Sequence, residues 1–269
     1  MAGNQVRRMT LENDRIPIMK KLVVANWKMN PKTPLEAKFI AKDVLKKVPK
    51  RVEVVLCPPT IFWNDVAKVK RPKNVYLGTQ NVFFEDKGAY TGEISAIMAK
   101  GGGATFSIVG HSERRALGES DEMIAKKVLA TKNAKLIPII CVGEKERDNQ
   151  GVYLNFLKKQ IINAVSLLSK NAIKDICIAY EPLWAIGKDA NSAMNSHDVH
   201  QTALFIRKVF IDLYGQNGKG VKVLYGGSVA PENCFELVKN GEVDGLLVGH
   251  QSLVPENFVK IIVAISKIR

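Results

Sequence analysis

The sequence predicts a single-domain α/β protein folded as a closed (β/α)8 barrel. Eight short apolar, β-branched segments recur along its 269 residues, and a helix-like segment follows each of them. The length lies near the roughly 250 residues that are typical of this fold. No change of composition and no linker rich in Pro, Gly or Ser divides the chain. These repeated units favour a closed barrel over a doubly wound sheet.

The predicted strands are apolar runs of the kind that a parallel sheet buries on both faces. In chain order they are residues 22–25, 52–56, 75–77, 106–109, 136–142, 176–179, 221–224 and 243–248.

Apolar residues at helical spacing predict amphipathic helices between these strands, each with its apolar side facing the core. The four clearest sets are Leu35, Phe39, Ile40, Val44 and Leu45; Leu157, Ile161, Val165 and Leu168; Leu204, Phe205, Val209 and Phe210; and Phe258, Ile261, Ile262 and Ile265. The barrel domain is therefore expected to span residues 21–269. Residues 1–20 mix basic and acidic side chains without an apolar stretch, which predicts a polar N-terminal arm rather than a targeting segment.

The charge balance is basic, since 40 Lys and Arg against 26 Asp and Glu give a formal net charge of +14. Such a charge suits nucleic acid, an acidic membrane surface or small anions. The lysines are scattered as singles and pairs, without a basic run, an RNA-binding aromatic signature or zinc-ligand spacing. No apolar run is long enough to span a bilayer. We therefore expect a solvated basic surface that attracts small anions, with neither nucleic acid nor membrane as a partner.

The four cysteines lie far apart, and three of them fall in or beside predicted strands: Cys57, Cys141, Cys177 and Cys234. This spacing indicates buried, reduced thiols rather than a disulfide framework or a metal site. It predicts a reducing compartment, and we expect the cytoplasm.

Glu181 is the centre of the predicted functional site. It follows the buried strand at residues 176–179, and Pro182 restrains it toward an extended conformation. The next residues, Leu183 to Ile186, are apolar, which is typical of a flap that closes over a ligand. The alternative interpretation is a buried strand-to-helix turn.

The other predicted strands also end in polar or glycine-rich segments, and active sites of barrels lie where the strands end. These segments are Asn26-Trp27-Lys28, Gln80-Asn81, His111-Ser112-Glu113, Gly226-Gly227-Ser228 and Gly249-His250. Each alone is also compatible with an ordinary polar loop.

Together, Glu181, His111, Lys28 and Asn26 comprise a base, an electrophile, a fixed cation and an amide. The sequence shows no nucleophile-plus-base pair, no clustered metal ligands and no GxGxxG loop beside them. This set favours removal of a proton next to a carbonyl, with hydrogen bonds stabilising the resulting enediolate. The glycines at 226–227 and 249, with Ser228, indicate backbone N–H groups for a phosphate; the alternative for Gly226-Gly227 is a tight turn.

Five segments of the chain resemble, in order, the signature segments of the triosephosphate isomerase family. They are residues 26–30 (NWKMN), 88–93 (GAYTGE), 109–115 (VGHSERR), 179–187 (AYEPLWAIG) and 225–229 (YGGSV). The resemblance covers about residues 21–269 and implies the TIM barrel fold. It also implies interconversion of dihydroxyacetone phosphate and D-glyceraldehyde 3-phosphate, a step of glycolysis and gluconeogenesis, without metal or organic cofactor.

The resemblance also implies a role for each matching residue. Glu181 would be the base, and His111 would be the electrophile, as a neutral imidazole. This enzyme family is itself a well-known example of a Glu base that acts beside a His of lowered pKa. Lys28 and Asn26 would bind the substrate oxygens, and Glu113 would be the charged partner of Lys28. The phosphate would be held by backbone N–H groups of Gly187, Ser228, Gly249 and His250.

Members of this family form homodimers, and the resemblance implies the same here through the loop at residues 80–93. Thr91 would then lie near Asn26 and Lys28 of the second copy. Phe83, Phe84 and Tyr90 supply apolar side chains of the kind that interfaces use.

The chain departs from the family pattern in two places. Gly187 runs directly into Lys188-Asp189-Ala190, where the family usually continues Thr-Gly-Lys-Thr-Ala. One alignment removes two residues from the tip of the flap, and a gap elsewhere is equally allowed. We expect a flap that closes less tightly. His250 stands where the family often has a second glycine, and must tolerate the local φ. His197 and His200 are expected to be capping or surface residues.

Two alternatives to the isomerase remain at this stage. Another phosphate-binding barrel enzyme, such as a sugar-phosphate epimerase, would explain the glycines but would need its own acid–base pair or metal ligands. A catalytically silent barrel that binds anionic partners would explain the charge, but not the full set of site residues.

Overall fold

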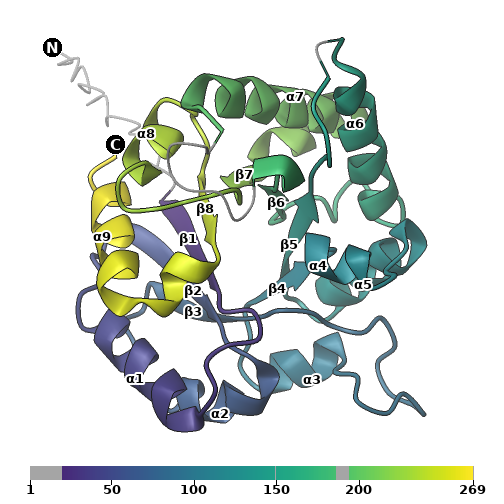
Figure 1. The fold of residues 1–269 in the computed structure, drawn as a ribbon. Helices are drawn as coiled ribbons and strands as arrows, with labels where there is room; N and C mark the ends of the chain where they lie inside the picture. Colours follow the sequence, from purple (N-terminus) through teal and green to yellow (C-terminus); the bar gives the residue numbers. More distant parts are fainter. Residues whose placement is uncertain (1–19, 149, 186–193, 269) are drawn as a thin grey trace, which may run out of the picture.

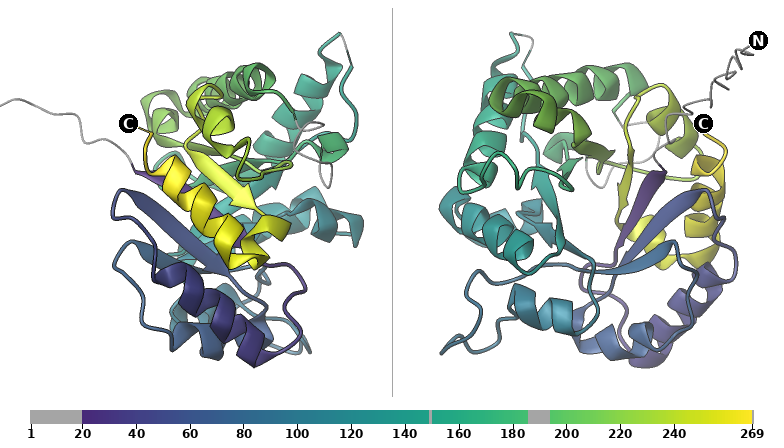
Figure 2. Two further views of the ribbon diagram at one scale, coloured as in Figure 1. Left: turned by 60° about the vertical axis from the view of Figure 1, so that its left-hand side comes forward. Right: turned by 180° about the vertical axis from the view of Figure 1, so that it is seen from behind.

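A computed structural model describes residues 20–148, 150–185 and 194–268 of the chain. Eight parallel strands lie side by side in chain order, and β1 pairs with β8 to close the ring. Figure 1 looks into this ring, with the helices on its outside. Figure 2 shows from the side and from behind that the helices surround the strands. The predicted (β/α)8 barrel is confirmed.

All eight predicted strands are present, and their ends differ from the predicted ones by at most two residues. They are β1 (Lys21–Asn26), β2 (Val52–Cys57), β3 (Val75–Thr79), β4 (Phe106–Val109), β5 (Ile137–Val142), β6 (Cys177–Tyr180), β7 (Lys222–Tyr225) and β8 (Gly245–Val248).

The helices vary more in length than the strands do, and two of them, α4 and α5, follow β4. The α-helices are α1 (Pro34–Leu45), α2 (Trp63–Ala67), α3 (Ala96–Gly101), α4 (Ser112–Ala116), α5 (Asp121–Asn133), α6 (Val152–Val165), α7 (Ser196–Tyr214), α8 (Cys234–Lys239) and α9 (Pro255–Ile265). Short 3-10 helices are η1 (Thr60–Phe62), η2 (Leu183–Ala185), η4 (Gly215–Gly220) and η5 (His250–Leu253).

Polar side chains fix where several helices begin, because the first N–H groups of a helix need acceptors from outside it. Thr33 accepts from the N–H of Glu36 at the start of α1, and Pro34 follows it. Ser120 caps α5 and Asn195 caps α7 in the same way. Because Asn195 is the cap of α7, His197 and His200 are not capping residues; His197 is exposed, as expected of a surface residue, and His200 is half-buried.

The strands are buried on both faces, as their continuous apolar sequences predict. Alternate residues, such as Leu22 and Val24, belong to the cluster inside the barrel. Their neighbours Val23 and Ala25 belong to the larger cluster between the strands and the helices. Because each strand faces two apolar layers, neither face carries the polar alternation of an exposed sheet. All four cysteines are free and buried.

The expected apolar side of α1 is only partly buried. Ile40, Val44 and Leu45 pack in the core, but Leu35 and Phe39 are 77% and 61% exposed. Leu204 on α7 is also largely exposed. The prediction was wrong for these residues because the apolar side of a helix can be wider than the part of the helix that packs against the barrel.

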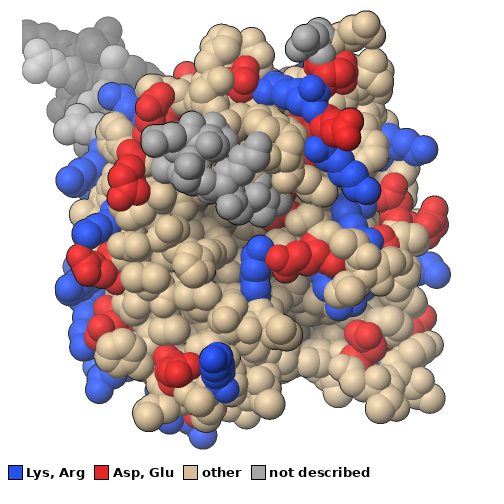
Figure 3. Space-filling model, viewed as in Figure 1, with Lys and Arg blue, Asp and Glu red and all other residues tan. Residues whose placement is uncertain are grey.

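Acidic and basic side chains are interspersed on the face shown in Figure 3, which agrees with the scattered lysines of the sequence. None of the described helices is both long and apolar enough to cross a membrane.

A buried lysine links the loop after β3 to the segment between α4 and α5. Lys127 is fully buried, and its Nζ lies 2.5 Å from Glu119 Oε1 and 2.9 Å from Asn81 Oδ1. Arg114 Nε also donates to Glu119 Oε1, over 2.7 Å. A charge buried in this way is tolerated only while its partner remains.

We therefore expect the substitution Lys127→Met to lower the free energy of unfolding by about 3–5 kcal/mol, because it leaves Glu119 buried beside fewer donors. Chemical denaturation measures this change. The neighbouring Lys126 is exposed and lies over the Phe84 ring at 5.1 Å, so Lys126→Met should cost less than about 1 kcal/mol. Equal losses in the two variants would contradict the assignment.

Candidate functional site

The predicted strand ends converge at one mouth of the barrel. Contacts link the ends of five strands: Glu181 after β6 touches His111 after β4, Glu113 pairs with Lys28 after β1, and Gly226 and Gly249, after β7 and β8, lie against Glu181 and Lys28. Gln80 after β3 also reaches Lys28. Residues separated by more than two hundred positions therefore share one site.

Glu181 is held rigidly at the end of β6. Its N–H donates to the Val142 carbonyl over 2.8 Å, and the residue is only 3% exposed. Oε1 lies 3.2 Å from His111 Nε2, and Oε2 accepts from the Ser112 N–H at 3.4 Å. A Cβ at Gly143 would lie 1.8 Å from the Glu181 carbonyl oxygen, and one at Gly226 would lie 2.9 Å from Glu181 Cγ. The two glycines therefore allow neighbouring strand ends to approach this carboxylate.

His111 is placed by the start of α4, where it is the N-cap residue. Its Nδ1 accepts from the Glu113 N–H over 3.2 Å, so in the neutral ring the proton is on Nε2, which faces Glu181. The structure thus selects one tautomer. Nε2 is the ring atom that can donate a hydrogen bond into the mouth of the barrel.

The protonation of His111 depends on its neighbours. Burial lowers the pKa of His111, but the Glu181 carboxylate raises it by charge and by hydrogen bonding, and Glu113 adds to this, so that the net pKa is above its ordinary value. As long as the two side chains are in contact, Glu181 therefore favours the protonated form of His111, whereas the resemblance implies the neutral imidazole.

Lys28 has an unusual backbone conformation for a residue other than glycine, with φ of 52°. Such conformations persist where surrounding groups enforce them, and they are common at functional sites. Here the Asn26 side chain accepts from the Lys28 N–H over 3.1 Å, and Gln80 Nε2 donates to the Lys28 carbonyl over 2.9 Å. Lys28 Nζ lies 2.6 Å from Glu113 Oε1. The backbone of Lys28 is thus fixed from both sides.

The residues expected to hold a phosphate fall into two groups. Ser228, Gly249 and His250 lie beyond the ends of β7 and β8, on the same side of the barrel as Lys28. Gly187 and the altered segment that follows it lie outside the described residues. Ser228 also donates its hydroxyl to the Ala185 carbonyl over 2.8 Å and so connects the β7 end to η2.

His250 does not need a backbone conformation that favours glycine. It is the first residue of η5, a 3-10 helix, whose dihedral angles any residue adopts. Its side chain is exposed.

Glu144 was missed at the level of sequence. It is 2% exposed, and its Oε1 accepts from Tyr180 Oη at 2.8 Å and from Trp184 Nε1 at 2.9 Å. Burial, and then the Glu144 carboxylate, raise the pKa of the Tyr180 hydroxyl, which keeps it a donor. Glu144 anchors the start of the segment after Glu181. Glu181 was identified because it follows a buried strand, and Glu144 likewise follows the buried strand β5.

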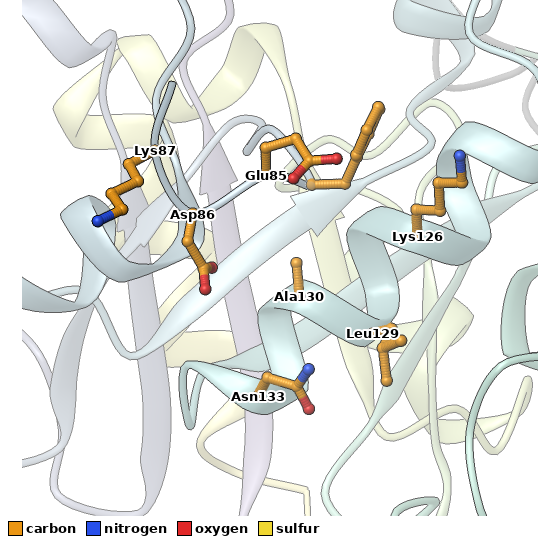
Figure 4. Close-up of a pocket in the computed structure, with 8 residues that line it drawn as sticks. Glu85, Asp86, Lys87, Lys126, Leu129, Ala130 and Asn133 are labelled. Atoms are coloured by element: carbon orange, nitrogen blue, oxygen red, sulfur yellow. The ribbon is translucent and has the colours of Figure 1, made fainter. Parts of the chain in front are cut away.

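A cavity of about 350 Å³ opens beside the site, and its walls include Asn26, Lys28 and His111. Another cavity, of about 390 Å³, lies between the loop after β3 and α5. Figure 4 shows Glu85 and Asp86 of that loop on one side of it, and Lys126 and Asn133 of α5 on the other. Its two carboxylates are matched by Lys87 and Lys126, so the lining has no net positive charge that would favour a phosphate. Among the described residues, no three His, Cys, Asp or Glu side chains gather in a way that would hold a metal ion.

Fold and site together define a class of protein. A (β/α)8 barrel that places a buried carboxylate, an imidazole and a fixed lysine at the carboxyl ends of its strands is an enzyme of acid–base chemistry on small anions.

A family model described as triosephosphate isomerase matches residues 21–265, and the chain belongs to the triosephosphate isomerase family. Triosephosphate isomerase from Aquifex aeolicus is 42% identical over 248 residues, which cover 91% of this chain and 99% of that protein. The enzyme from Caldanaerobacter subterraneus subsp. tengcongensis is 40% identical over 247 residues, covering 90% of this chain and 98% of the relative.

The crystal structure of triosephosphate isomerase from Bartonella henselae matches with a TM-score of 0.81 at 34% sequence identity, and the match covers 92% of this chain and 100% of that one. The resemblance seen in the sequence is thereby confirmed.

We expect Glu181→Gln to lower the pKa of His111, because it removes the carboxylate that raises this pKa while the burial that lowers it remains. NMR titration of labelled histidine measures this shift, and His111→Gln identifies its signal among the four histidines. Glu146→Gln, at an exposed position, is the control. An unchanged or raised pKa in Glu181→Gln would show that Glu181 is not the cause.

Proposed function

We propose that this chain interconverts dihydroxyacetone phosphate and D-glyceraldehyde 3-phosphate, with Glu181 as the base and His111 as the electrophile. Membership of the triosephosphate isomerase family supports the reaction, which belongs to glycolysis and gluconeogenesis. The observation that supports the two roles best is the 3.2 Å contact between Glu181 Oε1 and His111 Nε2 at the barrel mouth.

The proposed steps move protons only. Glu181 removes a proton from the hydroxymethyl carbon of dihydroxyacetone phosphate, while the Nε2–H of His111 donates a hydrogen bond to the carbonyl oxygen. The electron pair of the broken C–H bond forms the enediolate, and His111 passes a proton between its two oxygens. Glu181 then returns its proton to the neighbouring carbon, which gives the aldehyde. No net proton or electron is gained or lost.

The contact between base and electrophile has a consequence for this mechanism. A substrate carbon and its carbonyl oxygen must lie between Glu181 and His111, so binding has to separate the two side chains. Separation weakens the interaction that raises the pKa of His111, and burial then favours the neutral ring. On this proposal, the substrate itself brings His111 to the neutral form that donates from Nε2.

Lys28 and Asn26 are proposed to bind the substrate oxygens. Lys28 supplies the positive charge that a dianionic substrate requires, and the exposed Glu113 holds its Nζ at the mouth of the site. The backbone N–H groups of Ser228, Gly249 and His250, with Gly187, are proposed to hold the phosphate. No metal or organic cofactor has a part in these steps.

A homodimer through the loop at residues 80–93 is also part of the proposal. This loop extends away from the barrel between β3 and α3 (Figure 1), and Tyr90 and Thr91 are exposed on it. Phe83 packs against Phe84 and Tyr90, with ring centroids 4.3 Å and 4.7 Å apart, which gives the loop an apolar core of its own.

The surface near the site supports this arrangement. Met29, Ile61 and Leu117 are 95%, 81% and 77% exposed, so these apolar side chains are available for contact with a second copy. Met29 and Leu117 also line the 350 Å³ cavity beside Asn26 and Lys28. The loop of a second copy, with Thr91 at its tip, is proposed to enter this cavity.

A cytoplasmic location is proposed because all four cysteines are free, as in proteins of a reducing compartment. Neither nucleic acid nor a membrane is needed for the proposed activity.

The main test is a coupled assay with glyceraldehyde 3-phosphate. We expect Glu181→Gln to lower kcat by roughly 10²–10⁴-fold or more, because an amide cannot accept the proton. Activity should persist in the presence of a chelator. Glu146→Gln should retain full activity, since this side chain is exposed and does not line the cavity beside the site. If Glu181→Gln kept more than about half of the rate, the proposed base would be wrong.

The dimer is tested by analytical ultracentrifugation. Tyr90→Asp puts a charge on the proposed interface, and we expect it to shift the mass of the particle toward that of the 29.8 kDa chain and to reduce activity at low protein concentration. Leu167→Asp is the matched control, since Leu167 is similarly exposed, at 49% against 45% for Tyr90, outside this surface. A wild-type protein that sediments as a monomer would exclude the dimer.

A further inference from the structure

The part of α1 that does not reach the core faces a groove. Leu35 and Phe39, which are largely exposed, line it together with Leu45 and with Val69, which follows α2. The groove has a volume of about 620 Å³. Its floor is therefore apolar, although it lies on the outside of the barrel.

Lysines stand on both sides of this groove. Lys38 and Lys42 of α1 and Lys46, its C-cap residue, recur every four residues, so that they share one side of the helix. Lys68 and Lys70 stand on the opposite side, after α2. The groove thus combines an apolar floor with a basic rim on each side.

Acidic neighbours neutralise only part of this rim. Asp65 lies 3.4 Å from Lys38, and Asp43 lies 2.8 Å from Lys46. The other three lysines, Lys42, Lys68 and Lys70, have no ion-pair partner within 4.0 Å among the described residues. The rim therefore keeps a net positive charge.

The groove is separate from the candidate functional site. None of Asn26, Lys28, His111 and Glu181 lines it. Figure 2 shows α1 beside α9 on the outer side of the molecule, and in Figure 3 basic side chains recur along the left edge, where these two helices lie. Substitutions in the groove are therefore not expected to disturb the isomerase reaction.

We propose that this groove docks an acidic, amphipathic helical segment of a partner protein. Such a segment would place its apolar side chains on Leu35, Phe39 and Val69, and its flanking carboxylates beside the lysines. A small anion alone would leave the apolar floor uncovered. A flat lipid surface would not fill a concave groove. A second copy docked groove to groove would bring lysines against lysines.

The test uses a synthetic amphipathic peptide of about 20 residues, with leucines on one face and glutamates on its flanks. Fluorescence polarisation with the full-length chain should give a Kd on the order of 10 μM, which rises with salt. Phe39→Ala, and separately the double variant Lys42→Glu with Lys68→Glu, should each weaken binding by about tenfold or more.

Matched variants distinguish the groove from general attraction to a basic protein. Phe156→Ala removes an aromatic ring that is also largely exposed, and Lys158→Glu with Lys159→Glu makes the same change in net charge on α6. These variants should bind the peptide like the wild type. Isomerase activity and circular dichroism show that every variant is folded.

Several results would overturn the proposal. One is no binding of the peptide at low salt, and another is equal weakening by the α6 variants. Binding of phosphatidylserine vesicles that depends on Phe39, without binding of the peptide, would assign the groove to a lipid surface instead. A fall in the mass of the particle on Phe39→Ala, measured by ultracentrifugation, would assign it to a second copy of this chain.

Discussion

Closure of the barrel is the constraint on which the rest of the structure depends. Pairing of β1 with β8, from Leu22 opposite Gly245 to Ala25 opposite Val248, joins the two ends of the sheet. As a result, the end of β1 lies beside the end of β8, and a Cβ at Gly249 would lie 3.4 Å from Lys28 Cε, although the two residues are 221 positions apart. Every strand runs in the same direction, so all the strand ends that carry polar residues open at one mouth. The site exists because the ring is closed.

Charge at this mouth is arranged in two pairs with different surroundings. Glu181 and His111 are nearly dry, whereas Lys28 and Glu113 are partly in water, with side chains 32% and 57% exposed. An interaction between charges is stronger where water is excluded, so Glu181 affects the protonation of His111, whereas the outer pair mainly holds a lysine in place. A ligand that enters between Glu181 and His111 therefore disturbs the inner pair, whose interaction is the stronger of the two. The closed ring, by burying Glu181 and His111, therefore also sets how the site responds to substrate.

Charged and apolar side chains outside the site lie on the outer surface of the barrel. The net charge of +14 is spread over helices, but along α1 the lysines share a side, next to Leu35 and Phe39, which the core does not cover. Neither feature contributes to the chemistry at the mouth. A helix needs only a narrow strip of apolar side chains to pack on the barrel, so a wider stripe leaves part of its surface for another contact.

Much of the fold and of the candidate site could be predicted from the sequence. The eight strands were found within two residues, because a strand buried on both faces needs a continuous apolar run that few other structures need. Glu181, His111 and Lys28 were found because each follows such a run. Glu144 follows one as well, but its role became visible only from its contacts with Tyr180 and Trp184.

The sequence by itself determined the order of strands and helices, the family and the residue types at the strand ends, since these depend on local pattern and on short motifs. The tertiary structure alone decided three further features. They are the direct contact of Glu181 with His111 and its effect on the pKa of the imidazole, the positive φ of Lys28, and the exposure of Leu35 and Phe39. Each depends on the distance between groups far apart in the chain, and no local pattern encodes that distance.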